Sequence, residues 1–254
     1  MKRFTRLAMI ITFMSISLLG CGNKIDQAES NQQPVHQQQS NYFVSDQKAE
    51  INSTEDQITW KTDKVTLIAK KSPATITSMQ ISNDSDEYDI RIPEEITGNS
   101  AELTSIALNS NHQFIAVNVF IANVGNQIIF VDLSNGESYT LNELAGISYE
   151  TIHAFGWSPI DNKLALAYGD TSSSKLAIYD FDQHQLQNIS DINLINTLYI
   201  LWTKQGDGFD FISEANSDQF KLYRYKTGND EVKEIAEISR EELSKFNEYG
   251  PDRF

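Results

Sequence analysis

The chain has 254 residues, 40% of them apolar, so it can bury one sizeable core or at most two small ones. It carries 35 acidic against 20 basic residues, for a net charge of −15. Binding to nucleic acid and adhesion to anionic lipid headgroups both need clustered Lys and Arg. The composition argues against both and indicates a well-solvated acidic surface.

The first 21 residues form a distinct segment. Three basic residues precede an apolar stretch, Leu7 to Leu19, whose length is typical of a signal peptide rather than a membrane-spanning helix. The stretch ends in Leu-Leu-Gly-Cys at positions 18–21, which resembles the lipobox of bacterial lipoproteins. The resemblance implies that residues 1–20 are removed by cleavage between Gly20 and Cys21 and that Cys21 carries the lipid. It also implies a lipid-anchored location on the extracytoplasmic face of the cell membrane. The alternative is an uncleaved anchor helix that contains an ordinary buried cysteine.

Cys21 is the only cysteine, so the domain that follows has no disulfide and no thiol metal cluster. Residues 21–57 are polar and rich in Gln, Asn and Ser. Such a composition buries too little apolar surface to offset the entropy of ordering. The sequence therefore predicts a disordered tether over 21–57.

From Ile58 onward, short alternating apolar runs are separated by Asn, Asp, Gly and Ser turns, which predicts an all-β domain. The stretch that contains Trp157 aligns with the stretch that contains Trp202, 45 residues later. An earlier copy places Leu108 at the tryptophan position, and a fainter first copy begins at Ile58. Each copy reads as four strands, and a period near 45 with four strands per unit is typical of propeller blades.

The stretch "WSPIDNKLALAY" at 157–168 resembles the TolB-type or WD40-like propeller repeat. This resemblance implies a small β-propeller-like array of about four four-stranded blades over residues 58–236. The second and fourth copies lack the Ser-Pro turn of the third. An incomplete or open propeller, or closure by oligomerisation, therefore stands beside a closed four-bladed ring.

Residues 237–254 change character. Ser239 with Glu242 matches a capping box, Ile238 with Leu243 matches a hydrophobic staple, and Phe246 shares a face with Leu243. The pattern predicts one short C-terminal helix packed on the last sheet. The alternative is a helix that docks on a partner.

The four histidines, His36, His112, His153 and His184, lie in the tether or in different repeats, without the spacing of metal ligands. His112 and His184 fall at predicted turns. His153 begins a predicted strand, where a hydrogen-bonded structural imidazole is expected. No nucleophile elbow, metalloprotease pair or phosphate-binding glycine loop is present in the sequence.

Two acidic pairs, Asp180 with Asp182 and Asp207 with Asp210, raise the question of calcium. The second pair is expected to point to opposite faces of a strand that begins at Phe209, so turn chemistry explains these residues better. Aromatic residues also recur at the repeat spacing, which predicts inter-blade core rather than a ligand platform. They are Trp157, Phe181, Trp202, Tyr223 and Tyr225.

No catalytic residue, metal ligand or cofactor is assigned from the sequence. Loops on a propeller rim commonly recognise partners. We therefore expect a membrane-anchored binding or scaffolding module for an envelope protein or a cell-wall component, with no nucleic acid as partner. The alternatives are a propeller-based hydrolase of the cell envelope and an accessory subunit of a separate envelope enzyme or sensor.

Overall fold

A computed structural model describes residues 39–46, 48–148, 150–189, 194–216 and 219–254. The chain divides into two units, 1–31 and 32–254, and every described residue belongs to the second. The expected signal peptide, its cleavage site at Gly20–Cys21, the lipidated Cys21 and His36 lie outside the described residues. In the part that is described, no helix combines the length and apolar character needed to span a membrane.

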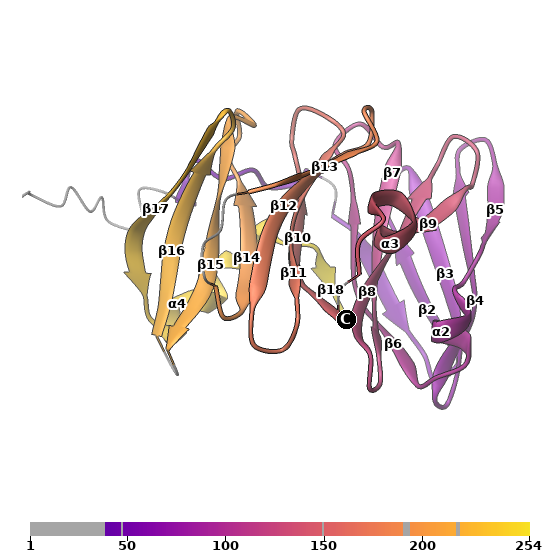
Figure 1. The fold of residues 1–254 in the computed structure, drawn as a ribbon. Helices are drawn as coiled ribbons and strands as arrows, with labels where there is room; N and C mark the ends of the chain where they lie inside the picture. Colours follow the sequence, from indigo (N-terminus) through magenta and orange to yellow (C-terminus); the bar gives the residue numbers. More distant parts are fainter. Residues whose placement is uncertain (1–38, 47, 149, 190–193, 217–218) are drawn as a thin grey trace, which may run out of the picture. The chain divides into compact units, whose positions relative to one another are not determined.

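Four antiparallel sheets follow one another along the chain, and we call them blades 1 to 4 (Figure 1). Blade 1 has the order β1 (Glu50–Ser53), β2 (Gln57–Lys61), β3 (Val65–Ser72), β4 (Thr75–Asn83) and β5 (Glu87–Ile90). Blade 2 has the order β18 (Asp252–Arg253), β6 (Ala101–Leu108), β7 (Phe114–Ile121), β8 (Gly125–Asp132) and β9 (Ser138–Thr140). Blade 3 comprises β10 (Thr151–Trp157), β11 (Lys163–Gly169), β12 (Ser174–Asp180) and β13 (Gln185–Asn188). Blade 4 comprises β14 (Thr197–Trp202), β15 (Gly208–Asn216), β16 (Gln219–Lys226) and β17 (Asn229–Ile238).

The helical segments are short. They are α2 (Glu94–Thr97), α3 (Leu141–Ala145), α4 (Arg240–Leu243) and the 3₁₀ helix η1 (Ser244–Tyr249). The all-β, propeller-like array of four blades with a short C-terminal helix is therefore confirmed.

The core lies mainly between neighbouring blades. One apolar cluster joins blade 1 to blade 2, a second joins blade 2 to blade 3, and a third joins blade 3 to blade 4. A fourth cluster covers the other face of blade 4 and contains Tyr42 and Phe246 from the ends of the described chain. The apolar stacking therefore runs through blades 1, 2, 3 and 4 in that order. Among the described residues, no core cluster joins blade 1 directly to blade 4.

The repeat alignment is reproduced in the strand register. Trp157 pairs with Leu164 and Trp202 pairs with Phe209, each seven residues on. Leu108 pairs with Ile115 in the same way. In blade 1 the equivalent pair is Trp60 with Leu67, so Trp60 is the repeat tryptophan of the faint first copy.

Each repeat tryptophan donates its indole N–H outside its own blade. Trp157 donates to the main-chain oxygen of Ala107 in blade 2 at 3.0 Å, and Trp202 donates to that of Gly156 in blade 3 at 2.8 Å. Blade 1 has no preceding blade, and Trp60 donates instead to the Oδ2 atom of Asp252 in β18 at 2.8 Å. The C-terminal strand thus supplies the acceptor that a preceding blade supplies elsewhere.

The structure differs from the expected tether boundary at Gln57. Strand β1 occupies Glu50–Ser53 and pairs with β2. Tyr42 is buried, and the main chain beside it bonds to the end of β14, from Phe43 N to Trp202 O at 2.8 Å and from Lys204 N to Asn41 O at 2.9 Å. Tyr42, bonded to the buried Asp210, and the four residues of β1 hold this polar stretch on the domain. A composition averaged over the whole segment does not reveal these few contacts.

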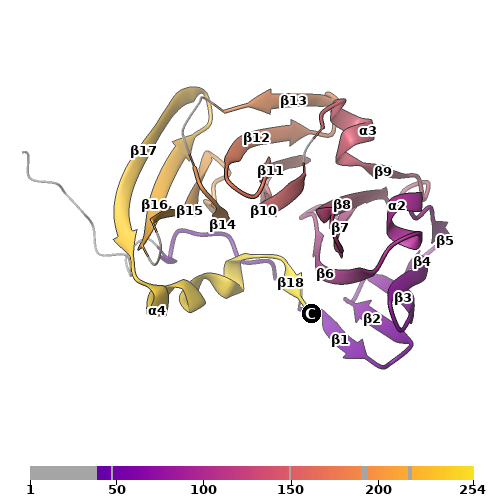
Figure 2. The same ribbon diagram turned by 60° about the horizontal axis from the view of Figure 1, so that its bottom comes forward.

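The C-terminal prediction is confirmed and extended. The Glu242 carboxylate accepts from the backbone N–H of Ser239 at 3.0 Å, and Ile238, Leu243 and Phe246 pack in the cluster on blade 4. Beyond the helix the chain continues to β18, which pairs with β6 of blade 2 (Figure 2). The helical segment therefore leads from the last blade to the second one.

Candidate ligand pocket on the first repeat strands

Three successive blades share one irregularity in the first strand of the repeat. The register shifts by one residue between Leu103 and Ser105 in β6, between Ile152 and Ala154 in β10, and between Thr197 and Tyr199 in β14. The three bulged residues are Thr104, His153 and Leu198, and each lies four residues before the tryptophan position of its repeat. A bulge bends a strand and redirects a side chain. Here the same bend is repeated in blades 2, 3 and 4.

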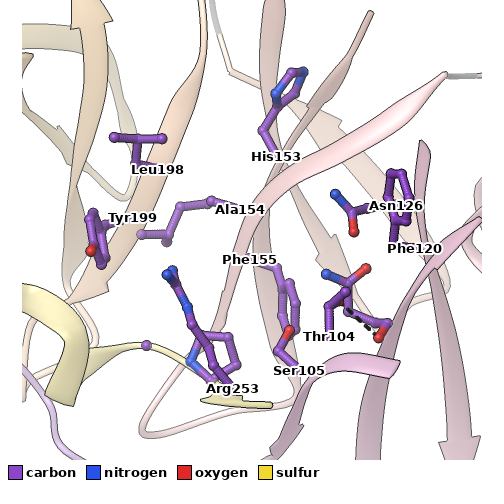
Figure 3. A pocket seen from close by; sticks show the side chains of 14 residues that line it. Thr104, Ser105, Phe120, Asn126, His153, Ala154, Phe155, Leu198, Tyr199 and Arg253 are labelled. Carbon is purple, nitrogen blue, oxygen red and sulfur yellow. Dashed lines mark hydrogen bonds between the residues drawn. The ribbon is translucent and has the colours of Figure 1, made fainter. Parts of the chain in front are cut away.

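The bulged residues line a single cavity of about 450 Å³, which we call the inner-strand pocket (Figure 3). Its walls come from β6, β7, β8, β10 and β14, together with the C-terminal segment. The lining residues are Thr104, Ser105, Asn118, Phe120, Asn126, His153, Ala154, Phe155, Leu198, Tyr199, Ile200, Gly250, Pro251 and Arg253.

The pocket opens where blade 2 is incompletely covered by blade 3. Asn118 and Phe120 on β7 continue the face that buries Ala116 in the cluster between these blades, because residues two apart share a face. Near Trp157 this face of β7 is packed against blade 3. Near Phe120, whose exposed fraction is 42%, the same face borders the cavity.

Two buried polar atoms in the wall have no hydrogen-bond partner among the described residues: Oδ1 of Asn118 and Nε2 of His153. The other ring nitrogen of His153, Nδ1, lies 2.9 Å from Oδ1 of Asn196. The donor and acceptor roles of the two ring nitrogens depend on the tautomer of the ring. Both unsatisfied atoms have less than 1 Å² of accessible surface, so they lie behind the surface of the cavity rather than on it.

The charge of the lining is opposite to that of the chain. Arg253 is its one permanently charged residue, and none of the lining residues is Asp or Glu. The Arg253 guanidinium lies over the Tyr199 ring, 5.3 Å from its centroid, and among the described residues no carboxylate pairs with it. Pairing of Asp252 with Ile106 and of Arg253 with Ser105 fixes β18 at the edge of the cavity.

Of the three histidines that the structure describes, His153 alone lines this pocket. His112 and His184 lie in turns with positive φ of 62° and 51°, as their predicted positions suggested. The expected hydrogen bond of His153 is present at Nδ1, whereas the lack of a hydrogen-bond partner at the buried Nε2 was not anticipated.

The acidic pairs behave as turn or core residues. Asp180 accepts from the backbone N–H groups of Asp182 and Gln183, both at 3.0 Å, and Asp207 accepts from the Thr203 hydroxyl at 2.6 Å. Gly206 beside it has φ of 67°, a left-handed conformation suited to glycine. Within the described part of the chain, no cluster of three or more His, Cys, Asp or Glu is arranged to hold a metal ion.

Asp210 was not recognised from the sequence as a core residue. It is fully buried on the outer face of blade 4 and accepts two bonds from Arg224, Nε to Oδ1 and Nη2 to Oδ2, both at 2.8 Å. The Tyr42 hydroxyl donates to Oδ2 at 2.6 Å. Burial, followed by the charge of Asp210, raises the pKa of Tyr42 well above its usual value, and the bond to Asp210 raises the pKa of Arg224.

The recurring aromatic residues are inter-blade core, as predicted. Trp157 and Phe181 lie between blades 2 and 3, where their ring centroids are 5.1 Å apart. Trp202, Tyr223 and Tyr225 belong to the cluster between blades 3 and 4. None of the five lines the inner-strand pocket.

Comparison with known proteins gives only structural matches. No protein-family model matches the chain, and no curated protein matches it in sequence. A putative TolB from Agrobacterium tumefaciens is 10% identical, with a TM-score of 0.43, over 77% of this chain and 62% of that one. TolB from Acinetobacter baumannii is 16% identical, with a TM-score of 0.45, over 81% of this chain and 61% of that one. The tricorn protease is 10% identical, with a TM-score of 0.49, over 74% of this chain and 23% of that one.

The chain thus spans about six tenths of the length of the TolB structures it matches. At these identities the matches concern the fold alone. The propeller-like architecture rests on the four sheets themselves.

Proposed function

We propose that the chain is a lipid-anchored, extracytoplasmic binding module and that its ligand enters the inner-strand pocket. The anchor is Cys21, and the ligand is a cell-wall component or part of an envelope protein. The observation that carries the binding role is the pocket itself: a cavity of about 450 Å³ built from the same bulge in three blades, with Arg253 as the one permanently charged residue of its lining.

Two further features support this proposal. The folded domain contains no cysteine, so it needs no disulfide chemistry after export. The pocket lining offers no pair of carboxylates, which is the arrangement that hydrolysis by general acid and base commonly requires. A binding role therefore accounts for the pocket better than a hydrolase does.

The anchor is tested with the full chain and the variant Cys21→Ser. We expect the native protein to incorporate labelled palmitate and to sediment with membranes, and the variant to lose the label. A variant that still takes up palmitate would show that Cys21 is not the lipid attachment site.

The site is tested by blocking the pocket after folding. The folded domain has no thiol of its own, so Phe120→Cys at the rim gives a single reactive site for a bulky maleimide. The matched variant is Ile160→Cys, because Ile160 is 64% exposed and lies outside the pocket lining. The two labelled proteins are compared for binding to solubilised envelope proteins and to purified cell-wall fragments.

We expect labelling at position 120 to lower binding at least tenfold and labelling at position 160 to leave it unchanged. Equal binding by both labelled proteins would place the ligand elsewhere and would contradict the proposal.

A further inference from the structure

We infer that residues 250–254 form a strap that detaches from β6 while the four blades stay folded, and that its detachment opens one end of the inner-strand pocket. The purpose of this movement rests on the proposed function, because it admits a ligand to the pocket. The movement itself is measured without any ligand. It follows from where the strap lies, from how thinly it covers the residues beneath it and from how it is attached.

The strap forms one end of the pocket. Gly250, Pro251 and Arg253 belong to the pocket lining. Arg253 pairs with Ser105 of β6, and Figure 3 shows both residues at the lower end of the pocket. Detachment of the strap therefore removes one wall of the cavity and exposes Ser105.

The strap is a thin cover over deeply buried residues. None of its five residues is buried, and the exposed fraction of Phe254 is 41%. Ser105 and Ile106, with which β18 pairs, have exposed fractions of only 5% and 0%. A segment with few buried contacts separates from its neighbours at a free-energy cost far below that of global unfolding.

The side chains of β18 reach two further blades, because successive strand residues point to opposite faces. Asp252 accepts the indole hydrogen bond of Trp60 in blade 1 at 2.8 Å. The Arg253 guanidinium lies 5.3 Å from the centroid of the Tyr199 ring in blade 4. A contact between an exposed arginine and an aromatic ring is weak. The bond between Asp252 and Trp60 is therefore the main side-chain attachment of the strap.

The segment just before the strap is firmly seated. Phe246 of η1 is fully buried on blade 4, and Oδ1 of Asn247 accepts from the Tyr199 hydroxyl at 2.7 Å. The backbone N of Gly250 lies 3.5 Å from the Asn247 oxygen, a long hydrogen bond, and Pro251 has no N–H to donate. The chain therefore bends at these two residues when the strap detaches, and the helical segment stays in place.

Three chemically identical reporters test the movement in the native chain. Exchange of the indole N–H for deuterium is followed by NMR for Trp60, Trp157 and Trp202. We expect Trp60 to exchange about tenfold faster than the other two, because its acceptor lies on the strap and theirs are main-chain oxygens of neighbouring blades. Burial alone predicts the opposite order, since the exposed fractions are 1%, 5% and 4%. Exchange of Trp60 at the rate of Trp202, or more slowly, would overturn the inference.

Thiol labelling tests whether the strap uncovers the pocket. The full chain with Cys21→Ser has no cysteine, so Ser105→Cys adds a single thiol beneath the strap. Its reaction with a chromogenic aromatic disulfide is timed in this background and again with Asp252→Ala added. Loss of the bond to Trp60 favours the detached strap, and we expect labelling to become about tenfold faster.

Ile178→Val is the matched control. Ile178 is buried in blade 3 outside the pocket lining, and loss of one methyl group lowers the overall stability without touching the strap. We expect this change to leave the labelling rate of Ser105→Cys as it was. Equal acceleration by both changes would mean that the thiol reacts only after global unfolding. No acceleration by Asp252→Ala would mean that the thiol is reached with the strap in place, and either result would overturn the inference.

These outcomes are separate from those of the proposed function. If the strap tests fail but maleimide at position 120 still blocks envelope binding, the pocket is a binding site with a fixed wall. If the strap detaches but maleimide at position 120 leaves binding unchanged, the strap stands and the proposed binding site is wrong.

Discussion

Blades 1 and 4 are the two ends of the stacked array, and their outer faces are built in opposite ways. In blade 1 the face away from blade 2 is almost entirely polar: Thr66 and Lys70 on β3 lie beside Ser82 and Ser78 on β4. In blade 4 the face away from blade 3 is apolar and is covered by Tyr42, Phe246 and their neighbours in the terminal segments.

The difference shows that neither end of the stack, as far as the structure describes it, leaves an apolar face for a further blade to cover. A polar outer face needs no cover, and the apolar one is covered by the chain itself. Among the described residues, closure by oligomerisation, one of the alternatives raised by the repeat count, therefore finds no uncovered apolar face at either end. On blade 4 the terminal segments cover the apolar face that a further blade would otherwise cover.

Substitution of Asp210 is expected to have the largest effect. Asp210→Ala leaves the Arg224 charge and the Tyr42 hydroxyl without their buried partner, and removal of one member of such a group costs about 3–5 kcal/mol. The matched change in blade 1 is Asp84→Ala, which breaks an exposed pair with Lys64 at 3.8 Å and should cost less than about 0.5 kcal/mol. Urea denaturation measures both, and equal losses would remove the contrast between the two blades.

Tyr42→Phe removes only the hydroxyl bond to Asp210. A hydrogen bond to a charged group contributes about 1.5–3 kcal/mol, and we expect a loss in this range at pH 7. Because folding raises the pKa of Tyr42, its contribution is present below the unfolded value of 10.0 and is lost as the pH rises above it.

Above pH 10, the titration of Tyr42 lowers the free energy of unfolding of the native protein by about 1.4 kcal/mol for each pH unit. Other tyrosines also titrate there, so the measured quantity is the difference in slope between the native protein and Tyr42→Phe. Tyr88→Phe in blade 1 is the comparison, and a slope change as large as that of Tyr42→Phe would contradict the special position of Tyr42.

Asp252→Ala tests how blade 1 is held. It leaves the Trp60 indole N–H without an acceptor and should cost about 1–2 kcal/mol. Asp252→Asn keeps an oxygen at the same place and is expected to recover most of the loss. The indole N–H resonance of Trp60 should shift in the alanine variant, while that of Trp202, bonded to Gly156, should not.

The smallest effect is expected on the outer face of blade 1. Ser78→Lys changes an exposed side chain on a polar face and should alter stability by less than about 0.5 kcal/mol. Sedimentation should show the same oligomeric state before and after the change. A change in oligomeric state would indicate that this face contacts another copy.

The repeat and the C-terminal helix follow from local patterns, and both could be predicted. Trp157 and Trp202 occupy equivalent register positions because every blade fills the same gap, and Ser239 with Glu242 marks a helix start by spacing alone. Asp210 was read as a turn residue because its partners are distant in the sequence. Arg224 lies on the next strand, and Tyr42 lies 168 residues away in a segment with the composition of a linker.

The pocket could not be predicted for a related reason. A bulge shifts the alternation of faces by one residue, as Ile152 and Phe155 in one cluster show, and the sequence alone does not distinguish this shift from an irregular strand. Thr104, His153 and Leu198 also have no chemistry in common. Only the shared distance of four residues from the repeat tryptophan position connects them, and that distance acquires meaning once the register shift is seen.

The contact between Trp60 and Asp252 also bears on the order in which the molecule assembles. The indoles of blades 3 and 4 reach back 50 and 46 residues, so those contacts can form as each repeat leaves the ribosome. The partner of Trp60 lies 192 residues later in the chain. In a chain that folds in the order of its synthesis, the Trp60 contact is therefore the last of the three to form.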